Sequence, residues 1–591
     1  MEKPATATNG PIPQHSTFTF PDIHFSSNFD SGNLQKVEKI SNFHYALWVG
    51  PDCCNTLCEK SLRTWFYFSV ETKGFKTFTI KNLNLQGKLF RDGMKPLYRS
   101  SGSEWKRVES TLLCDVKGDV GSFFEVTFSF KFEDSPVFFA FSFPWSYSDH
   151  KEFLEDLRKR EFTELYFHSC NLINTLERRP CEILTISSFN QIELETEAPI
   201  INLYENTTRA YTFSNKPIIL ITARVHPGET PSSHVLNGLL KFLLSDDPRA
   251  TTLRDHYVFK IVPMLNPDGV YRGFFRTDTR GVDLNRTYSD PILRKHPTTY
   301  AIKELMKFYN SQLWAYIDLH AHVSKQGCFL YGNSLEFEAQ VMNVLYAKVL
   351  SNTCPWFSFD NCCFLDETVN REKHGKEGCG RFVAQKLLKL AHSYTLEVNY
   401  HSCKVISPVL ENQEVLNTVL DIEAFMNIGK IACVGILYLA GKHPEPVIDL
   451  NELKLEVSKI LAEQPAFKCN PEARKASKSI ENLNRYINAC KDNGKRYKYR
   501  LANILGDKKE KRILNCSTPS GLPQIRYPQI IQELRLNKPK ELSTRCVTAN
   551  ENSFQIRPRN GSFVKNRKNK KTRNSSLKVR ENNRCTDLII L

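Results

Sequence analysis

A histidine and a glutamate three positions apart are the first residues of the sequence whose types suggest metal chemistry. His226 and Glu229 lie in the stretch ARVHPGETPSSH, where Pro227 and Gly228 favour a tight, non-helical turn. A neutral imidazole and a carboxylate are suitable ligands for Zn²⁺, and they leave room for a third ligand and a water molecule. The spacing alone is a weak signal, because the same pair occurs by chance in surface turns. The other parts of a zinc hydrolase must therefore be sought elsewhere in the chain.

The stretch YIDLHAH offers a third ligand at the point where an apolar run ends. Asp318, His320 and His322 alternate along this run, so in a strand they share one face and only one or two can reach a single ion. His320 closes the apolar run, and we predict His320 as the third ligand and His322 as a rim or supporting residue. Three protein ligands leave the fourth position of one Zn²⁺ ion to water, whose pKa then falls to about 7.

Hydrolysis also needs a base that takes a proton from the attacking water. Glu397 lies in SYTLEVNY, near the middle of a β-branched and aromatic strand. A carboxylate in such a strand is costly unless it is paired or faces a metal. A base at this place can later donate the proton to the leaving amine. We predict Glu397 as the general base; the alternative is an edge-strand glutamate that faces solvent.

An arginine-rich segment is a candidate for holding the substrate. The stretch NPDGVYRGFFRTDTRGVDLNRTY contains four arginines and an adjacent asparagine: Arg272, Arg276, Arg280, Asn285 and Arg286. Guanidinium groups bind carboxylates with two hydrogen bonds and stay charged. One can grip a terminal carboxylate while another stabilises the oxyanion of a tetrahedral intermediate. A nucleic-acid-binding loop is the alternative, but the segment has no run of lysines and carries three aspartates.

The order of these motifs resembles a known family. The series HPGE, NPDGV, FFRTDTRGVDLNR, DLHAH and HSYTLEVNY is similar to the zinc carboxypeptidases, and more narrowly to the cytosolic carboxypeptidases. FDSGNLQKVEKI, RTWFYFSV and FPWSYSD also resemble the N-terminal domain of that subfamily. The resemblance covers roughly residues 29–440. It implies a β-sandwich before a zinc peptidase domain that removes branch or C-terminal glutamates of tubulin.

The resemblance also assigns roles in the arginine-rich segment. Arg276 matches the arginine that polarises the scissile carbonyl, and Asn285 and Arg286 match the pair that binds the terminal carboxylate. For the zinc ligands and the base, the resemblance implies the same residues that the chemistry suggested.

A preference for glutamate requires a positive group in the side-chain pocket. The stretch KHGKEGCGR, residues 373–381, precedes the Glu397 strand, where the family's pocket-lining segment lies. Arg381 is the first candidate for this group and Lys376 is the second. The alternative is a solvated loop with incidental charges.

Two features depart from the family pattern. The wider family often has a substrate-contacting tyrosine upstream of the base, but no tyrosine lies between Phe357 and Ser393. The same segment is short against the branch-point enzymes, which leaves branch-point versus linear preference open. Residue 283 is Asp where Asn is expected; the extra carboxylate could weaken the grip of Arg286 on substrate or orient that arginine.

The pattern along the chain predicts two folded domains between two unstructured segments. Residues 1–20 are polar and are expected to be disordered. Residues 21–150 contain short alternating runs that predict a β-sandwich, with packing as its role. Residues 151–440 alternate strand and helix patterns, and residues 441–591 form a basic, mostly disordered tail with some helix possible at 451–463.

The second domain is predicted to be an α/β zinc carboxypeptidase domain, with a mixed, largely parallel sheet and helices on both faces. The expected strands are 217–223, 257–265, 313–320 and 393–400. The expected helices are 148–160, 234–244, 300–309, 335–350 and 414–437. Chemistry in such folds collects beyond the carboxyl ends of the strands.

Composition limits the surroundings and the partners. The net charge of +16 favours an acidic partner, or else reflects a solvated basic tail. The 18 cysteines form no regular framework, and no apolar leader or run of about 18 apolar residues is evident, so we expect free thiols and no membrane. We expect a cytoplasmic, cytoskeleton-associated protein; the basic clusters leave a nuclear location open.

The sequence therefore favours a zinc metallocarboxypeptidase that removes glutamates from acidic tails, with tubulin and microtubules as partners. We expect a monomer that does not bind nucleic acid. Two alternatives remain: a non-catalytic protein that binds microtubules or nucleic acid through the basic tail, and an amidohydrolase that acts on small N-acyl amino acids.

Overall fold

The computed structural model describes residues 16–84, 87–117, 123–134, 136–205, 207–364, 377–406, 415–464 and 467. The chain divides into two compact units, Met1–Ile530 and Ile531–Leu591. The second unit lies outside the described residues, so the account below concerns the first unit alone. The basic clusters of the tail also lie outside them.

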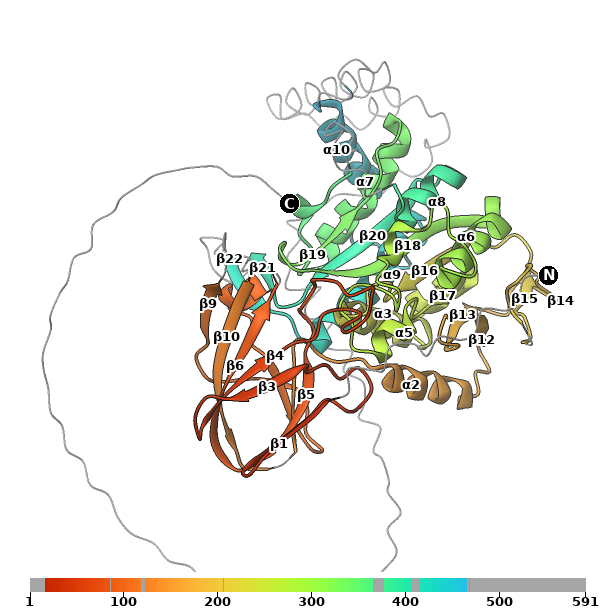
Figure 1. Ribbon diagram of the computed structural model, residues 1–591. Coiled ribbons are helices and arrows are strands. Elements are labelled where there is room, and N and C mark those ends of the chain that lie inside the picture. Colours follow the sequence, from red (N-terminus) through yellow and green to blue (C-terminus); the bar gives the residue numbers. More distant parts are fainter. Residues whose placement is uncertain are drawn as a thin grey trace, which may run out of the picture. The chain divides into compact units, whose positions relative to one another are not determined.

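The N-terminal region is a sandwich of two sheets, drawn in red and orange in Figure 1. The first sheet contains, in spatial order, β1 (Thr17–Phe20), β2 (Ile23–Ser26), β5 (Tyr67–Thr72), β11 (Val137–Ala140), β7 (Leu97–Ser100) and β8 (Lys106–Arg107). The second contains β3 (Lys36–Lys39), β4 (His44–Trp48), β6 (Gly74–Leu83), β10 (Phe123–Phe132) and β9 (Leu113–Lys117). A short helix, α1 (Lys88–Arg91), follows β6.

Phenylalanines from both sheets fill the space between them. The ring of Phe78 on β6 lies 6.0 Å from Phe25 on β2 and 5.7 Å from Phe139 on β11, measured between ring centroids. On its own sheet it lies 5.6 Å from Phe128. Alternation along each strand turns these rings inward, and each buried ring removes a large apolar area from water. The predicted strand-rich N-terminal domain is confirmed.

The expectation of disorder through residue 20 is wrong at its last residues. Thr17–Phe20 form β1 and pair antiparallel with β2. The alternation of Thr and Phe in this stretch is a strand pattern, and the edge of the first sheet offers it a partner. Residues 1–15 lie outside the described part of the chain.

A helix joins the sandwich to the second region. α2 (Tyr147–Lys159) occupies nearly the expected span of 148–160, and its N-cap is Ser146. The Ser146 hydroxyl accepts from the backbone N–H of Asp149, and the Asp149 carboxylate accepts from the N–H of Ser146. This reciprocal capping box fixes where the helix begins.

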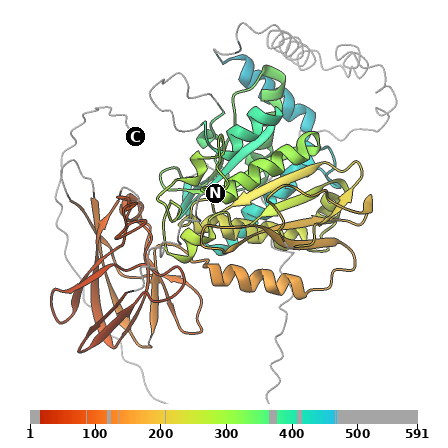
Figure 2. The same cartoon turned by 45° about the vertical axis from the view of Figure 1, so that its right-hand side comes forward.

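Seven strands form the central sheet of the second region, which Figure 2 shows with its helices. Their spatial order is β12 (Tyr166–Asn174), β13 (Pro180–Ser187), β17 (Val258–Val262), β16 (Ile218–Ala223), β18 (Leu313–His322), β20 (His392–Asn399) and β19 (Cys328–Tyr331). The strands β17, β16, β18 and β20 are parallel, whereas β12, β13 and β19 pair antiparallel at the two flanks. The mixed sheet is confirmed, with its parallel part in the middle. Two small hairpins stand apart: β14 (Ile192–Thr196) with β15 (Tyr211–Phe213), and β21 (Ser402–Ile406) with β22 (Val415–Val419).

Helices cover both faces of this sheet. α3 (Thr230–Leu243) and α4 (Pro248–His256) pack on one face, where α9 (Ile422–Leu439) lies against α3 and α7 (Phe337–Thr353). α6 (Pro297–Tyr309) and α8 (Gly380–Leu388) cover the other face. The remaining helical segments are short: α5 (Pro267–Tyr271) and the 3-10 turns Leu284–Arg286, Asn310–Gln312 and Phe359–Asn361.

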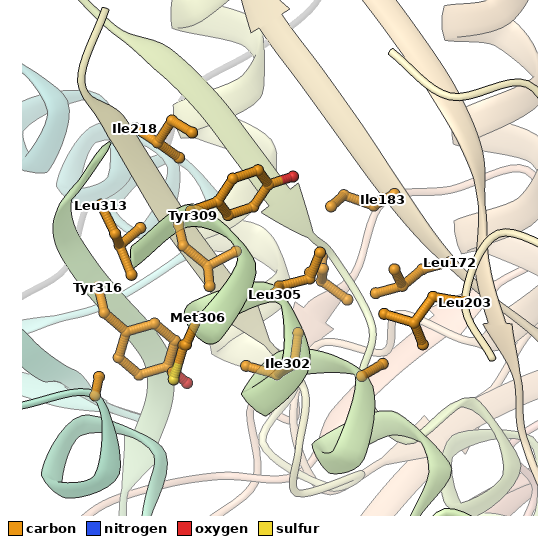
Figure 3. Packing of buried hydrophobic residues seen from close by; sticks show 14 of the residues in the cluster. Leu172, Ile183, Leu203, Ile218, Ile302, Leu305, Met306, Tyr309, Leu313 and Tyr316 are labelled. Carbon is orange, nitrogen blue, oxygen red and sulfur yellow. The ribbon is translucent and has the colours of Figure 1, made fainter. Parts of the chain in front are cut away.

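The core under α6 is a continuous apolar cluster. Figure 3 shows Ile302, Leu305 and Met306 of α6 facing Ile183 of β13 and Tyr316 of β18. Each of these five side chains is at most 2% exposed. Such packing makes the sheet a rigid support, because removing even one buried methylene from a dense core is costly.

The long helix α9 corrects two expectations. The first residues of the span expected to be helical, Val415–Val419, form strand β22 instead, and the helix starts after its N-cap Asp421. Contrary to the expectation that no apolar run is long enough, Ile422–Leu439 meets the length and composition of a membrane span, and 72% of it is buried inside the protein. Its burial against α3 and α7 is that of a core helix.

The packed chain also continues past residue 440. α10 (Leu450–Ala462) lies where a helix was thought possible, and it buries Leu453, Val457 and Leu461. Lys348 of α7 forms an ion pair with Glu456 at 2.7 Å. The tail predicted to begin at residue 441 therefore starts with a helix that packs on α7.

Candidate active site

Three side chains predicted as metal ligands meet at the carboxyl ends of the central strands. One ligand atom each from His226, Glu229 and His320 lie within 4.8 Å of one another, and all three residues are buried. The Nδ1 atom of His226 lies 2.8 Å from Oε1 of Glu229, and the Nδ1 atom of His320 lies 2.9 Å from Oε2. His320 lies 94 positions after His226 and 91 after Glu229 in the sequence, yet the three side chains converge on one point.

The turn that carries His226 and Glu229 is held by an arginine of the same motif. Arg224, which follows β16, has a positive φ of 55°. Its Nε and Nη2 atoms donate to the carbonyl oxygen of Pro227 at 3.0 and 2.6 Å. Gly228 lets Phe275 approach, because a Cβ at Gly228 would meet the Phe275 ring at 2.4 Å. The His-Pro-Gly-Glu turn is therefore held by hydrogen bonds from Arg224 and packs closely against Phe275.

Each imidazole is fixed at its other nitrogen by a second carboxylate. The Nε2 atom of His320 lies 2.9 Å from Oδ2 of Asp318, whose Oδ1 accepts from the Thr222 hydroxyl at 2.7 Å. The Nε2 atom of His226 lies 3.1 Å from Oδ1 of Asp283. This arrangement presents both Nδ1 atoms to the ligand cluster, which is how carboxylates orient metal-binding histidines.

The electrostatics of the cluster favour a cation. Burial raises the pKa of Glu229, but His226 and His320 lower it well below its usual value. Burial lowers the pKa of His320, but Asp318 and Glu229 raise it well above its usual value. Buried carboxylates that draw positive charge onto their neighbours make a site attractive to a metal ion.

Glu397 lies beside this cluster on the next strand. In the parallel pairing of β18 with β20, Glu397 is the partner of His320, and on its other side it pairs with Phe329 of β19. Its Oε2 atom is buried and makes no hydrogen bond to the described residues. Burial raises the pKa of Glu397 to about 7. An unpartnered buried carboxylate of this kind marks a site that is completed by something the protein binds.

The donor set fits zinc. Two imidazole nitrogens and one carboxylate, each imidazole backed by a carboxylate, form a donor set that would hold Zn²⁺ and would leave a coordination position for water, and Glu397 lies on the strand beside them. The structure thus brings together the three predicted ligands and the predicted base.

Arg276 faces the same cluster from a loop. Its Nε and Nη2 atoms donate to Oδ2 of Asp283 at 3.0 and 2.7 Å, and its side chain is 30% exposed. Burial lowers the pKa of Arg276, but Asp283, Glu229 and Glu397 together raise it. One carboxylate, that of Asp283, therefore links Arg276 to His226.

Asn285 and Arg286 sit in the 3-10 turn that follows Asp283. The Oδ1 atom of Asn285 accepts from the backbone N–H of Gly380 at 3.3 Å, and its Nδ2 lies 3.4 Å from Nε2 of His320. The Nη1 atom of Arg286 donates to the carbonyl of Asn285 at 2.9 Å, and the side chain reaches solvent. The expected contact between Arg286 and Asp283 is only electrostatic, because the oxygens of Asp283 bind His226 and Arg276.

Arg381, the first candidate for the side-chain pocket, begins α8 close to Asn285. Its Nε donates to the carbonyl of Gly332 at 3.0 Å, and its guanidinium lies 5.6 Å from the centroid of the Tyr331 ring. The charge of Arg381 acts on Glu397 and lowers that residue's pKa against the effect of burial. Lys376 lies outside the described residues.

His322 is not part of the metal cluster. Its Nδ1 accepts from the backbone N–H groups of Ser324 and Lys325 at 3.3 and 3.0 Å. Its ring packs against Phe329 with 5.2 Å between centroids. His322 thus shapes the turn after β18.

Comparison with known proteins agrees with this geometry. Residues 159–359 match a model described as zinc carboxypeptidase, and residues 25–142 match one described as cytosolic carboxypeptidase N-terminal domain. Cytosolic carboxypeptidase 6 of Homo sapiens is 36% identical over 391 residues, which cover 64% of this chain and 72% of that protein. The chain belongs to the cytosolic carboxypeptidase family.

Longer relatives within this family match as well. Cytosolic carboxypeptidase-like protein 5 of Bos taurus is 32% identical over 577 residues, which cover 72% of this chain. The chain spans 65% of the length of that relative. Glu397 and Arg381 lie beyond the span matched by the zinc carboxypeptidase model, so their placement depends on the strand register and contacts described above.

Solved structures share the fold at low sequence identity. A metallo-carboxypeptidase from Burkholderia cenocepacia superposes with a TM-score of 0.54 at 21% identity, covering 71% of this chain and 99% of that one. A metallo-carboxypeptidase from Pseudomonas aeruginosa, in complex with (2-guanidinoethylmercapto)succinic acid, has a TM-score of 0.53 at 18% identity, with 71% and 99% covered. These likenesses show that the chain shares the fold of metallo-carboxypeptidases.

The sequence alone did not predict the contacts of three residues that hold the site side chains in place: Asp318, Asp283 and Arg224. The role of Asp318 was within reach, since it shares the face of His320 two positions away. Asp283 was noticed only as a departure, and the sequence placed it beside Arg286 rather than between His226 and Arg276. Arg224 gave no signal, because its role depends on a positive φ that no residue type indicates.

Proposed function

We propose that this protein is a zinc-dependent exopeptidase that removes glutamates from acidic chain ends or from glutamate side-chain branches. The observation that carries the proposal is the meeting of three ligand atoms within 4.8 Å with the unpartnered Oε2 of Glu397 on the adjacent strand. A further support is that its relatives are named as carboxypeptidases. Tubulin tails are the first substrate to test.

His226, Glu229 and His320 would hold the ion, and Zn²⁺ bound there supplies a Lewis acid for the carbonyl and a water of lowered pKa. Glu397 then acts as the base: its carboxylate accepts the proton of the attacking water. As the C–N bond breaks, the same carboxyl group returns that proton to the leaving amine. The burial of Glu397 keeps bulk water from competing for the proton.

Arg276 supports the same step from the loop that follows α5. Its guanidinium donates hydrogen bonds to the carbonyl oxygen as negative charge develops there. Asp283 holds the guanidinium through two donors, which fixes its direction before the substrate arrives. Asn285 and Arg286, in the next turn, would bind the terminal carboxylate of the substrate and so confine cleavage to chain ends.

The proposed glutamate preference rests on Arg381. This arginine lies near Asn285 through Gly380, acts electrostatically on Glu397, and stacks over the ring of Tyr331. A glutamate side chain entering beside the terminal-carboxylate anchor would meet its charge. Tyr331 supplies an aromatic wall on the strand next to Glu397, and Lys376 stays a second candidate from the sequence.

The expected setting follows from the same chemistry. The relatives are named cytosolic carboxypeptidases, which supports a cytoplasmic protein. The net charge of +16 would assist capture of acidic tubulin tails within about one Debye length, ~8 Å at physiological salt. We propose association with microtubules as substrate, without nucleic-acid or membrane binding, and a monomeric enzyme; a nuclear location stays open.

The test is a panel of peptides read by mass spectrometry. The purified full chain is incubated with linear peptides ending in Glu, Gln or Leu and with a peptide that carries a branched glutamate. We expect glutamate release from the Glu-ending peptides, loss of release with a chelator, and recovery on addition of zinc. Microtubule binding with no cleavage of any peptide would favour the non-catalytic alternative. Cleavage of N-acyl amino acids alone would favour the amidohydrolase alternative.

A further inference from the structure

A buried carboxylate of the N-terminal sandwich reaches into the loop that carries Arg276. Asp52 lies between β4 and β5 and is 2% exposed. Its Oδ1 accepts from the backbone N–H of Phe275 at 2.7 Å. Its Oδ2 accepts from the N–H groups of Arg276 and Thr277, both at 2.8 Å, and from the Thr277 hydroxyl at 3.2 Å.

Three consecutive N–H groups that converge on one carboxylate form an anion-binding concavity. Residues 275–277 belong to no helix or strand, so these donors lack the partners that regular structure provides. The groups that contact the two Asp52 carboxylate oxygens among the described residues are all donors, which suits an ionised carboxylate. Burial raises the pKa of Asp52, and the three backbone donors oppose that rise. The Asp52 carboxylate thus accepts hydrogen bonds from the backbone N–H groups of residues 275–277. Without it, these donors would be left unpaired in an irregular segment.

The other end of Arg276 is held independently. While its backbone N–H binds Asp52, its guanidinium binds Asp283, which in turn contacts His226. Through Asp283 the guanidinium is tied to His226 of the cluster, where Glu229 and Glu397 also raise its pKa. Two carboxylates, one from each region of the chain, therefore define where this arginine can lie.

The same segment also touches the metal-binding turn. The backbone N–H of Gly228 donates to the carbonyl oxygen of Phe275 at 2.8 Å. A Cβ at Gly228 would lie 2.9 Å from the Cα of Phe275, so the two backbones are in close contact. A shift of residues 275–277 by a fraction of this distance would be felt at the turn between His226 and Glu229.

We infer that Asp52 of the N-terminal sandwich is a positioning residue for Arg276, which it aims at the scissile carbonyl by clamping the backbone of residues 275–277. The inference rests on the proposed function, because it assigns Asp52 a part in that reaction. The sequence predicted only a packing role for the sandwich, whereas this inference gives it a part in positioning a residue of the site. The sandwich does so without contributing any group that touches the substrate.

Other contacts between the two regions provide a matched control. The Ser31 hydroxyl donates to the carbonyl of Val270 at 2.8 Å, and the Asn33 side chain donates to the carbonyl of Gly273 at 3.1 Å. These bonds join the same two regions but stop short of residue 275. Ser31→Ala removes one such bond and leaves the clamp intact.

The kinetic test compares Asp52→Asn, Ser31→Ala, Arg276→Ala and the double variant Asp52→Asn/Arg276→Ala in the full zinc-loaded chain, on a Glu-ending peptide. An amide at residue 52 turns an N–H₂ toward backbone donors and should displace the segment. Because misplacement by about 1 Å can cost ~10²-fold, we expect kcat of Asp52→Asn to fall by about that factor with KM and zinc content little changed. In the Arg276→Ala background the same change should cost less than about 3-fold, and Ser31→Ala alone should also stay within that range.

An unchanged kcat in Asp52→Asn, or an equal loss in both backgrounds, would overturn the inference, since the second result marks a purely structural role. If Asp52→Asn does not fold, Thr277→Val decides, because it removes only the hydroxyl donor. We expect about a 5-fold fall in kcat that disappears in the Arg276→Ala background. No fall, or a fall that persists there, would overturn the inference.

A readout without catalysis separates this inference from the proposed function. Amide hydrogen exchange at residues 275–277 should accelerate in Asp52→Asn, or in Thr277→Val, and stay as in the wild type in Ser31→Ala. An inactive wild type would sink the proposed function. Exchange that is unchanged by the substitutions would show that Asp52 does not hold the segment, whatever the activity.

Discussion

The two halves of the candidate site are built in different ways. In the metal half, His320 and its support Asp318 lie on a central strand, and the His226 turn follows the strand beside it. In the arginine half, Arg276 lies on a loop without regular structure, and this loop is held by Asp52 of the sandwich. The ligands of the metal half therefore lie on a central strand or in the turn that follows one, whereas Arg276 depends on a backbone contact from a second region of the chain.

The sandwich and the α/β region form part of one compact unit, and specific contacts join them at the site. Phe141 of the sandwich packs on Phe275 and on Tyr400, with ring centroids 6.2 and 5.4 Å apart. The hydroxyl of Tyr400 donates to the carbonyl of Gly228 in the metal-binding turn at 3.3 Å. Apolar packing thus brings the sandwich to the back of the site, and polar contacts such as those of Asp52 set its fine position.

The largest effect is expected in the metal half. His320→Ala removes one of three ligands, and Oε2 of Glu229 keeps only the backbone N–H of Ala321 as a partner. Zinc content, measured on the purified protein by atomic emission, should fall from about one ion per chain to near zero, and hydrolysis should be lost. His322→Ala is the control on the same strand face, and it should keep its zinc. Full zinc in His320→Ala would break the assignment of this half.

The arginine half should lose rate without losing metal. Arg276→Ala removes the donor that faces the developing oxyanion, which should cost about 2.7–4 kcal/mol, or ~10²–10³ in kcat. Steady-state kinetics and zinc content measure the two effects separately. Arg280→Ala in the same loop should behave as the wild type, because among the described residues its side chain makes no hydrogen bond or ion pair with the cluster. A loss of zinc in Arg276→Ala would remove the distinction between the halves.

Asp283 belongs to both halves, since it contacts His226 and Arg276. Burial raises the pKa of Asp283, but His226 and Arg276 lower it well below its usual value, so it is charged at neutral pH. Asp283→Asn should weaken zinc binding by about 10–100-fold, as measured by competition with a chelator, and lower kcat as well. Asp278→Asn, in the same loop, should leave zinc affinity unchanged. Unaltered affinity in Asp283→Asn would show that the halves are independent.

The sequence was a better guide to the metal half than to the arginine half. The strands at 217–223, 313–320 and 393–400 were expected because buried parallel strands are continuous apolar runs. Polar residues that interrupt or end those runs, such as Glu397 and His320, stand out against the apolar background. The site residues of this half could therefore be placed on elements before their contacts were known.

The rest depended on contacts between distant segments. The partner of Asp52 lies more than 200 positions away, and no periodicity links the two. Asp283 was related only to Arg286, and its contacts with His226 and Arg276 were not expected, because a loop has no alternation from which to derive side-chain direction. The edge strand Thr17–Phe20 and the helix Leu450–Ala462 were missed or left open because short, partly polar elements are stabilised by the surface on which they pack.

A smaller effect should appear at the boundary between the two regions under acid. Burial lowers the pKa of His234 to about 4, and its ring lies among Phe143, Trp145 and Phe425. The unfolded chain would bind this proton near pH 6.5, so the contribution to stability is complete above that pH and falls toward pH 4 by about 1.4 kcal/mol per unit. In His234→Phe, the free energy of unfolding measured with denaturant should depend less steeply on pH by this amount. His392, whose pKa burial also lowers to about 4, should keep its share of the slope; an unaltered total slope would contradict the account.

The most direct test of the central claim is the zinc content and glutamate-release rate of Glu397→Gln, measured on one preparation with a Glu-ending peptide. The account predicts zinc content equal to that of the wild type and a rate lower by about 10²–10⁴-fold, because the variant keeps the ligands and loses the base. Release at the wild-type rate from zinc-loaded Glu397→Gln would contradict it.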